Sequence, residues 1–128
     1  QPVVVDGVTG LMWQGCAAGL SGGECGDGEA RTADWGEASL ECDALSWGVF
    51  DDWRLPDPKE LTSLVDTRAS SPCIDPSAFP ATPVGWYWTS SAWVFDGLAG
   101  WQVNFSSGHV GTSDKIVPCN FRCVRFAP

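Results

Sequence analysis

The residues best suited to acid–base or nucleophilic chemistry are one histidine and several closely spaced carboxylates. His109 is the single histidine, and no G-x-S-x-G elbow surrounds any serine, so no nucleophile has an evident base. Neighbouring carboxylates can raise one another's pKa and transfer protons. Such groups occur at Asp51–Asp52, Asp27 with Glu29, and Asp66 with Asp75. Turns and pairing with arginine explain them more simply, so we expect no catalytic residues and no enzyme.

Calcium is the metal that these acidic residues would suit best, because it prefers six to eight oxygen ligands. The 24–29 loop and the surroundings of Asp96 supply carboxylates in segments with turn-forming glycines. We expect no obligatory cofactor, and a structural calcium at one of these two places is the alternative that the sequence leaves open.

The six cysteines could form disulfides, bind zinc or act as reactive thiols. Zinc sites favour paired cysteines two to four residues apart, and only Cys119 and Cys123 come near that spacing. An even number is typical of disulfides in an oxidising compartment outside the cytoplasm, although six cysteines allow fifteen pairings. We therefore expect three disulfides among these residues: Cys16, Cys25, Cys42, Cys73, Cys119 and Cys123.

A further group of residues is suited to noncovalent binding. Trp86, Trp93 and Phe95 surround the end of an expected strand, and Asp96–Gly97 has a turn sequence. Aromatic side chains in loops at the end of a rigid scaffold often contact ligands, and their faces stack on sugar rings. The alternative is that these rings fill space between loops, and the sequence does not decide between the two.

The elements that must position these residues follow from local patterns. Residues 3–5 and 11–13 are expected to form a hairpin around Asp6–Gly7, and residues 15–31 a loop. Capping boxes at Asp34–Glu37 and Asp57–Glu60 predict helices over 34–45, stopped by Gly48, and over 57–65. A long ordered loop over 67–85, anchored by Cys73 and Phe79, should precede three strands. We expect these strands at 85–92, 99–105 and 121–126, with turns at 96–97, 106–108 and 112–114.

Length and charge exclude several classes of function. The chain has 128 residues, which predicts a single domain over 1–128. Its 16 acidic residues outnumber 7 basic ones, giving a net charge of −9. Binding to nucleic acids and other polyanions depends on clustered Lys and Arg, so no nucleic-acid partner is expected. No apolar run is long enough to insert into a membrane. The first residues lack the basic and then apolar pattern of a signal peptide, so we expect any signal or anchor to have been removed or to lie outside this sequence.

Several motifs, in order along nearly the whole chain, resemble the Lcl C-terminal domain family of bacterial surface modules. Trp13, Trp35, Trp53, Trp88 and Trp101 lie in these motifs and are expected to pack in the core, and Arg54, Arg122 and Arg125 to bond acids and carbonyls there. The resemblance implies an α+β, C-type lectin-like fold in which two helices flank a mainly antiparallel sheet. The motifs are Val8–Trp13, Trp35 with Ala38 and Cys42, Asp52–Pro56 with Glu60–Leu61, Ser77–Pro80, Tyr87–Ser91, Trp101–Phe105 with Gly108, and Arg122–Arg125.

The lectin-like fold also favours one disulfide, Cys42–Cys123, which would tie the first helix to the last strand. Cys16–Cys25 would close the glycine-rich run between them, and Cys73–Cys119 would pin the long middle loop near the last strand. Many C-type lectins bind sugar through calcium with a Glu-Pro-Asn-like triplet and Trp-Asn-Asp. The stretch Trp101–Asn104 departs from that pattern.

These features together predict a secreted or surface-displayed recognition or adhesin module that binds a carbohydrate or protein ligand. The contact surface would be the loops 92–100 and 106–116, with 67–84 as a further candidate. The alternative from another class is a structural or oligomerising domain of a larger surface protein, with an exposed apolar patch as the subunit contact. The expected ligand-binding residues are Trp93, Phe95, Asp96, His109 and Asp114.

Overall fold

Two capping boxes start the two helices of the computed structural model, which describes all residues 1–128. Helix α1 (Trp35–Ala44) begins after Asp34, whose side chain accepts from the Glu37 N–H while the Glu37 carboxylate accepts from the Asp34 N–H. Helix α2 (Pro58–Thr62) begins the same way at Asp57, with Glu60 as its partner. These reciprocal bonds satisfy backbone donors that a helix start leaves free.

The predicted range 34–45 matches α1 together with its caps, Asp34 and Leu45, whereas α2 ends before the predicted residue 65. Leu45 caps α1 in an extended conformation, so Gly48 lies beyond the helix and does not stop it. Helix α2 ends at Thr62, and its C-cap Ser63 donates its hydroxyl to the Glu60 carbonyl. A hydroxyl bonded to a helical carbonyl competes with the next turn of helix.

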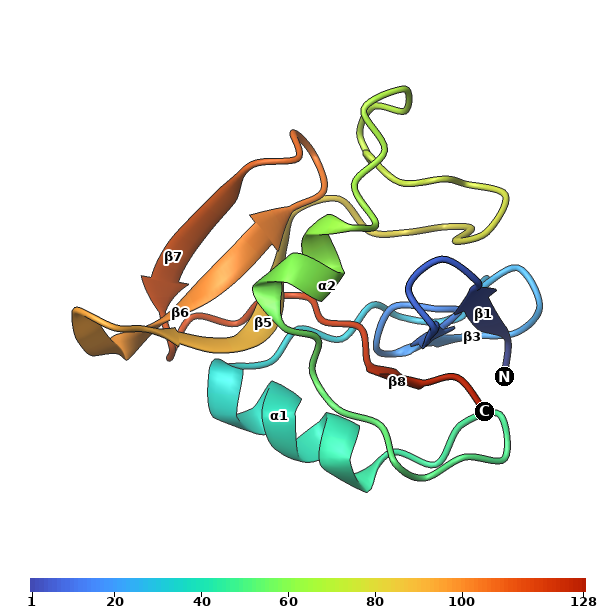
Figure 1. Ribbon diagram of the computed structural model, residues 1–128, viewed down its shortest axis with the longest axis horizontal. Coiled ribbons are helices and arrows are strands. Elements are labelled where there is room, and N and C mark those ends of the chain that lie inside the picture. The colour runs from blue at the N-terminus through green and yellow to red at the C-terminus, as the bar shows by residue number, and fades with distance from the viewer.

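The strands form three antiparallel sheets rather than the one sheet that we expected (Figure 1). One contains β1, β2 and β8, so the first and last strands flank β2. A small hairpin of β3 and β4 lies within the predicted loop over 15–31. The third sheet has the order β5-β6-β7. The strands are β1 (Val3–Asp6), β2 (Leu11–Gln14), β3 (Leu20–Ser21), β4 (Asp27–Gly28), β5 (Trp86–Trp93), β6 (Asp96–Asn104), β7 (Val110–Asp114) and β8 (Val124–Phe126).

The last segment of the chain connects the sheets and therefore forms a shorter strand than the predicted 121–126. The Gln14 N–H donates to the Cys123 carbonyl, and the Trp88 N–H donates to the Asn120 carbonyl. Arg54 and Val124 exchange both backbone bonds. Because each partner lies in a different element, residues 119–123 stay outside a regular ladder.

The two helices cover opposite faces of the β5-β6-β7 sheet, which separates two core clusters (Figure 1). Trp88 faces α1, and its indole N–H donates to the Ala33 carbonyl. Tyr87 has the opposite parity and packs with Leu61 of α2 and with Val103. Burial raises the pKa of the Tyr87 hydroxyl well above its usual range.

The tryptophans in the family-like positions mostly pack inside, as expected. Trp13, Trp53 and Trp88 are fully buried, whereas Trp35 and Trp101 are half-buried. The expected arginine partners are also present in the structure. Arg54 forms a bidentate pair with Glu60, Arg125 pairs with Asp52, and Arg122 donates to the Gln14 carbonyl.

The structure contains two of the three expected disulfides, Cys16–Cys25 and Cys42–Cys123. The third expectation is wrong, because Cys73 and Cys119 are free and buried. The Cys73 N–H donates to the carbonyl of Phe105, beyond the end of β6, whereas Cys119 accepts from the Gln102 amide within that strand. The two thiols are therefore fixed at different positions along β6.

Candidate functional site

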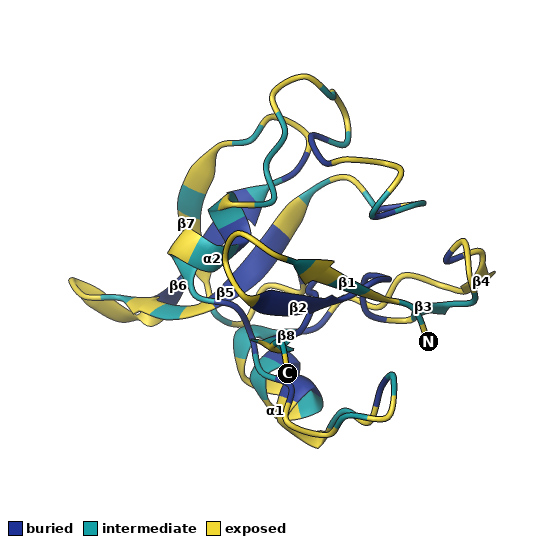
Figure 2. Ribbon diagram, turned by 45° about the vertical axis from the view of Figure 1, so that its right-hand side comes forward, coloured by how far each residue is buried: buried dark blue, intermediate teal, exposed yellow.

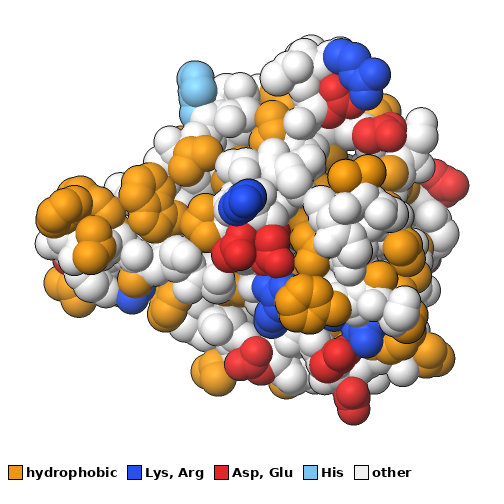
Figure 3. Space-filling model, viewed as in Figure 1, with side chains coloured by type: hydrophobic (Ala, Val, Ile, Leu, Met, Phe, Trp, Pro, Cys, Tyr) orange, Lys and Arg blue, Asp and Glu red, His pale blue; other side chains and the backbone are white.

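Several exposed apolar side chains lie close together at the tip of the β5–β6 hairpin, which extends away from the body of the molecule (Figures 1 and 2). Trp93 pairs with Asp96 across a two-residue turn of Val94 and Phe95. The exposed fractions of Val94, Phe95 and Leu98 are 85%, 84% and 74%. Figure 3 shows the hydrophobic side chains gathered at this tip. They contribute nothing to either core cluster.

The aromatic side chains at the tip support one another. The Trp93 and Phe95 rings meet edge to face, with centroids 5.9 Å apart and an angle of 75° between planes. This geometry suits the ring quadrupoles and holds both rings in place at an exposed position. The predicted turn at Asp96–Gly97 is wrong, because register shifts between Trp88 and Trp93 move the turn back by two residues.

The five predicted ligand-binding residues do not form one surface. Trp93, Phe95 and Asp96 lie at the hairpin tip, and Asp114 pairs with Ala99 near the same end of the sheet. The His109 carbonyl instead accepts from Asn104 at the far end of β6. Along a strand, the eight steps from Asp96 to Asn104 span about 26 Å. The loop containing His109 therefore lies apart from the tip.

The predicted turn over Thr112–Asp114 is also replaced by regular structure. These residues belong to β7, where Thr112 pairs with Trp101 and Ser113 with Gly100. Pairing with β6 satisfies their backbone groups, which outweighs the local turn preference. Trp86, a further aromatic candidate, is 36% exposed and lies over Gly111 of β7, so it covers the sheet rather than the tip.

No constellation for catalysis surrounds the histidine. The His109 side chain is exposed and makes no hydrogen bond or ion pair, and the residue is held by its backbone, whose N–H donates to the Ser107 hydroxyl and whose carbonyl accepts from the Asn104 N–H. A general base needs a positioned partner or substrate contact, which this arrangement does not provide by itself.

The loop over 67–85 is anchored at Cys73 and Phe79, as predicted, and borders an acidic cleft of about 470 Å³. Asp66, Asp75 and Asp6 of the first hairpin are among the residues that line it. Arg68 donates to the Asp66 carboxylate and lowers its pKa. No three His, Cys, Asp or Glu side chains anywhere in the protein are grouped so as to hold a metal ion.

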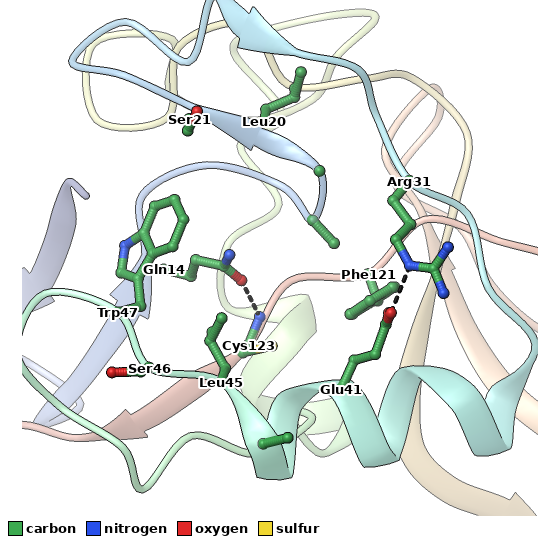
Figure 4. Close-up of a pocket in the computed structure, with 13 residues that line it drawn as sticks. Gln14, Leu20, Ser21, Arg31, Glu41, Leu45, Ser46, Trp47, Phe121 and Cys123 are labelled. Atoms are coloured by element: carbon green, nitrogen blue, oxygen red, sulfur yellow. Dashed lines mark hydrogen bonds and ion pairs between the residues drawn. The ribbon is translucent and has the colours of Figure 1, made fainter.

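A second cleft, of about 460 Å³, lies between α1, the β3 segment and residues 121–123 (Figure 4). Arg31 and Glu41 form an ion pair at one end, with 2.6 Å between Nε and Oε1. Trp47 lies at the other end, and Gln14 points into the space between them. Sequence reasoning missed this site because its residues come from segments far apart in the chain. The one local sign is the glycine-rich run that the Cys16–Cys25 disulfide closes.

Comparison with known proteins identifies the family. The Lcl C-terminal domain matches residues 2–125, and the chain therefore belongs to that family. No curated protein matches the chain. Membership in this family indicates that the chain is a surface-associated domain. It also confirms the resemblance that the sequence motifs indicated.

Proposed function

We propose that this Lcl C-terminal domain is a recognition module, displayed outside the cytoplasm, that binds a protein ligand through the β5–β6 hairpin tip without catalysing a reaction. The tip consists of residues Trp93 to Leu98. The observation that carries the proposal is the exposure of Val94, Phe95 and Leu98 on a hairpin that no other element covers. Contiguous exposed apolar side chains mark contact sites on soluble domains.

The disulfides support the location within this proposal, and the arrangement of strands and helices supports the fold. Disulfides persist in oxidising compartments, and the structure contains two. None of its helices has the length and apolar character needed to cross a membrane. The C-type lectin-like fold is supported by terminal strands that share a sheet, by two helices, and by the Cys42–Cys123 link between α1 and the start of β8.

The chemistry of the tip favours a protein over a carbohydrate ligand. Asp96 is its only charged side chain, and one of its oxygens accepts from the Leu98 N–H. Sugars need several convergent hydrogen-bonding groups, whereas an apolar recess on a protein surface needs an anchor such as Phe95. The rigid edge-to-face pair lowers the ordering cost of binding.

The test compares binding to an array of purified extracellular matrix proteins and to a glycan array, with and without a calcium chelator. The Phe95→Ala variant removes the exposed ring, and Leu40→Ala, at a residue 69% exposed on α1, is the matched control. We expect binding to a matrix protein that Phe95→Ala abolishes and Leu40→Ala preserves. Thermal unfolding of both variants should match that of the unsubstituted domain, because neither side chain packs in the core.

Three outcomes would contradict the proposal. Binding to the glycan array alone would make the domain a lectin, and loss of that binding with the chelator would place calcium at its site. Protein binding that survives Phe95→Ala would place the contact elsewhere. Sedimentation that shows an oligomer disrupted by Phe95→Ala would assign the tip to assembly, the alternative role for such a patch.

A further inference from the structure

We infer that the cleft between α1 and the glycine-rich segment is a second binding site, which takes a neutral, polyhydroxylated small molecule of about the size of a single sugar ring. The cleft shares no residue with the hairpin tip. The inference is therefore independent of the proposed protein contact. The volume of about 460 Å³ lies within the range of small-ligand pockets.

Two polar groups inside the cleft lack protein partners. Gln14 is 3% exposed, and its Oε1 accepts from the Cys123 N–H at 3.1 Å. Its Nε2 takes part in none of the hydrogen bonds and faces the cleft (Figure 4). Glu41 Oε2 is buried without a hydrogen bond, although Oε1 of the same carboxylate binds Arg31. Buried polar atoms without partners are rare, and Glu41 Oε2 is one of the two in this protein. A ligand hydroxyl at this end of the cleft would give that oxygen a donor.

The walls of the cleft are fixed by covalent and backbone bonds. The Cys16–Cys25 disulfide closes the segment that carries Ala18 and Leu20. The Ala18 N–H donates to the Phe121 carbonyl at 3.0 Å, and the Ala18 carbonyl accepts from the Arg31 N–H at 2.8 Å. A site held in this way before binding loses little conformational entropy when the ligand enters.

Gly19 lets the backbone of this wall come close to Arg31. Its φ is +92°, and a Cβ there would lie 2.1 Å from the Glu29 carbonyl oxygen and 2.6 Å from the Arg31 nitrogen. Only glycine combines this conformation with such a close approach. The close approach therefore fixes the backbone of Arg31 beside this wall, and the ion pair with Glu41 holds its side chain at the cleft.

The polar groups match hydroxyls better than a charged ligand. Gln14 Nε2 and Arg31 only donate, and Glu41 Oε2 only accepts, whereas a hydroxyl does both. Adjacent hydroxyls of a sugar can accept from Arg31 and donate to Glu41 while the ion pair stays intact. Ser21 and Ser46 add hydroxyls, and Leu45, Phe121 and Trp47 offer apolar surface to ring C–H groups.

The test is calorimetry and saturation-transfer NMR on the intact domain with glucose, galactose, mannose and N-acetylglucosamine, alongside glycine and glutamate. We expect at least one sugar to bind and neither amino acid to do so. The Glu41→Gln variant should weaken sugar binding about tenfold or more, since it replaces a charge-assisted acceptor by a donor. Asp43→Asn, at an exposed residue on the same helix outside the cleft, removes the same charge and should leave binding unchanged.

Two further measurements distinguish binding in the cleft from binding at the hairpin tip. Binding should shift the side-chain amide resonances of Gln14 in the native protein, and Phe95→Ala should leave sugar affinity unchanged because the tip lies outside the cleft. If Glu41→Gln reduces stability, Ser21→Ala tests the rim hydroxyl instead. Binding of amino acids without sugars, no binding of any sugar, or shifts confined to the hairpin tip would each overturn the inference.

Discussion

Replacing Cys42 and Cys123 by alanine should destabilise the domain more than the same replacement of Cys16 and Cys25. The first disulfide joins residues 81 apart in sequence, and the second joins residues 9 apart. In the chain-entropy model, the longer loop restricts the unfolded chain more. The expected losses are about 4.5 kcal/mol for the long loop and about 2.7 kcal/mol for the short one.

The two double variants are matched in their effect on packing. Cys16 and Cys42 are 0% exposed, and Cys25 and Cys123 are 1% and 2% exposed. Each double substitution therefore removes two buried sulfur atoms, and the difference between the variants, about 1.8 kcal/mol, reflects loop length. Domains of this kind have about 5–15 kcal/mol of stability, so loss of the longer link brings the protein close to unfolding.

Urea unfolding followed by tryptophan fluorescence measures both losses as free energies of unfolding extrapolated to water. Cross-link removal also enlarges the unfolded ensemble, so the m-value should rise more for the Cys42→Ala/Cys123→Ala variant. The reasoning is refuted if the Cys16→Ala/Cys25→Ala variant loses as much free energy or more.

Three further outcomes follow from the structure. The bond from Arg54 lowers the folded-state pKa of Glu60 below its ordinary 4.5, so its stabilisation is present above that pH and lost as the pH falls through the folded pKa. Urea unfolding of Glu60→Gln should therefore depend less on pH below 4.5 than that of the unsubstituted protein, and equal slopes would contradict this. Mass spectrometry after alkylation should find Cys73 and Cys119 modified in the denatured protein and protected in the native one, because both thiols are free and buried; a third disulfide would refute the assignment. Gly100→Ala should lower stability by about 1–3 kcal/mol, measured by urea unfolding, because the new Cβ would lie 3.0 Å from two tryptophan rings; an unchanged midpoint would show that the rings can move.

The helix starts were predictable because their stabilising bonds are local. In a capping box, each of two residues three apart accepts a hydrogen bond from the other's backbone N–H. The structure contains both predicted boxes, Asp34 with Glu37 and Asp57 with Glu60. Helix ends were less predictable, since competing bonds such as Ser63 to Glu60 depend on the final turn. The first hairpin likewise followed from a turn sequence between two apolar runs.

Part of the candidate site was also predictable from the sequence. The aromatic cluster near residue 95 was recognised from composition, but its turn position was not. The shifted register between Trp88 and Trp93 sets that turn, and register depends on the partner strand. For the same reason Thr112–Asp114, which has turn-forming residues, became a strand once β6 paired with it.

The sequence by itself determined the family, the helix starts and the acidic charge, and it predicted two disulfides that the structure contains. Only the tertiary structure decided that Cys73 and Cys119 stay apart, that His109 lies far from the hairpin tip, and that Gln14 and Glu41 share a cleft. Capping bonds join residues three apart, so a short sequence motif is enough to predict them. Residues 14, 31, 41 and 121 meet only after long loops close, and the free energy of that closure depends on the packing of the whole chain.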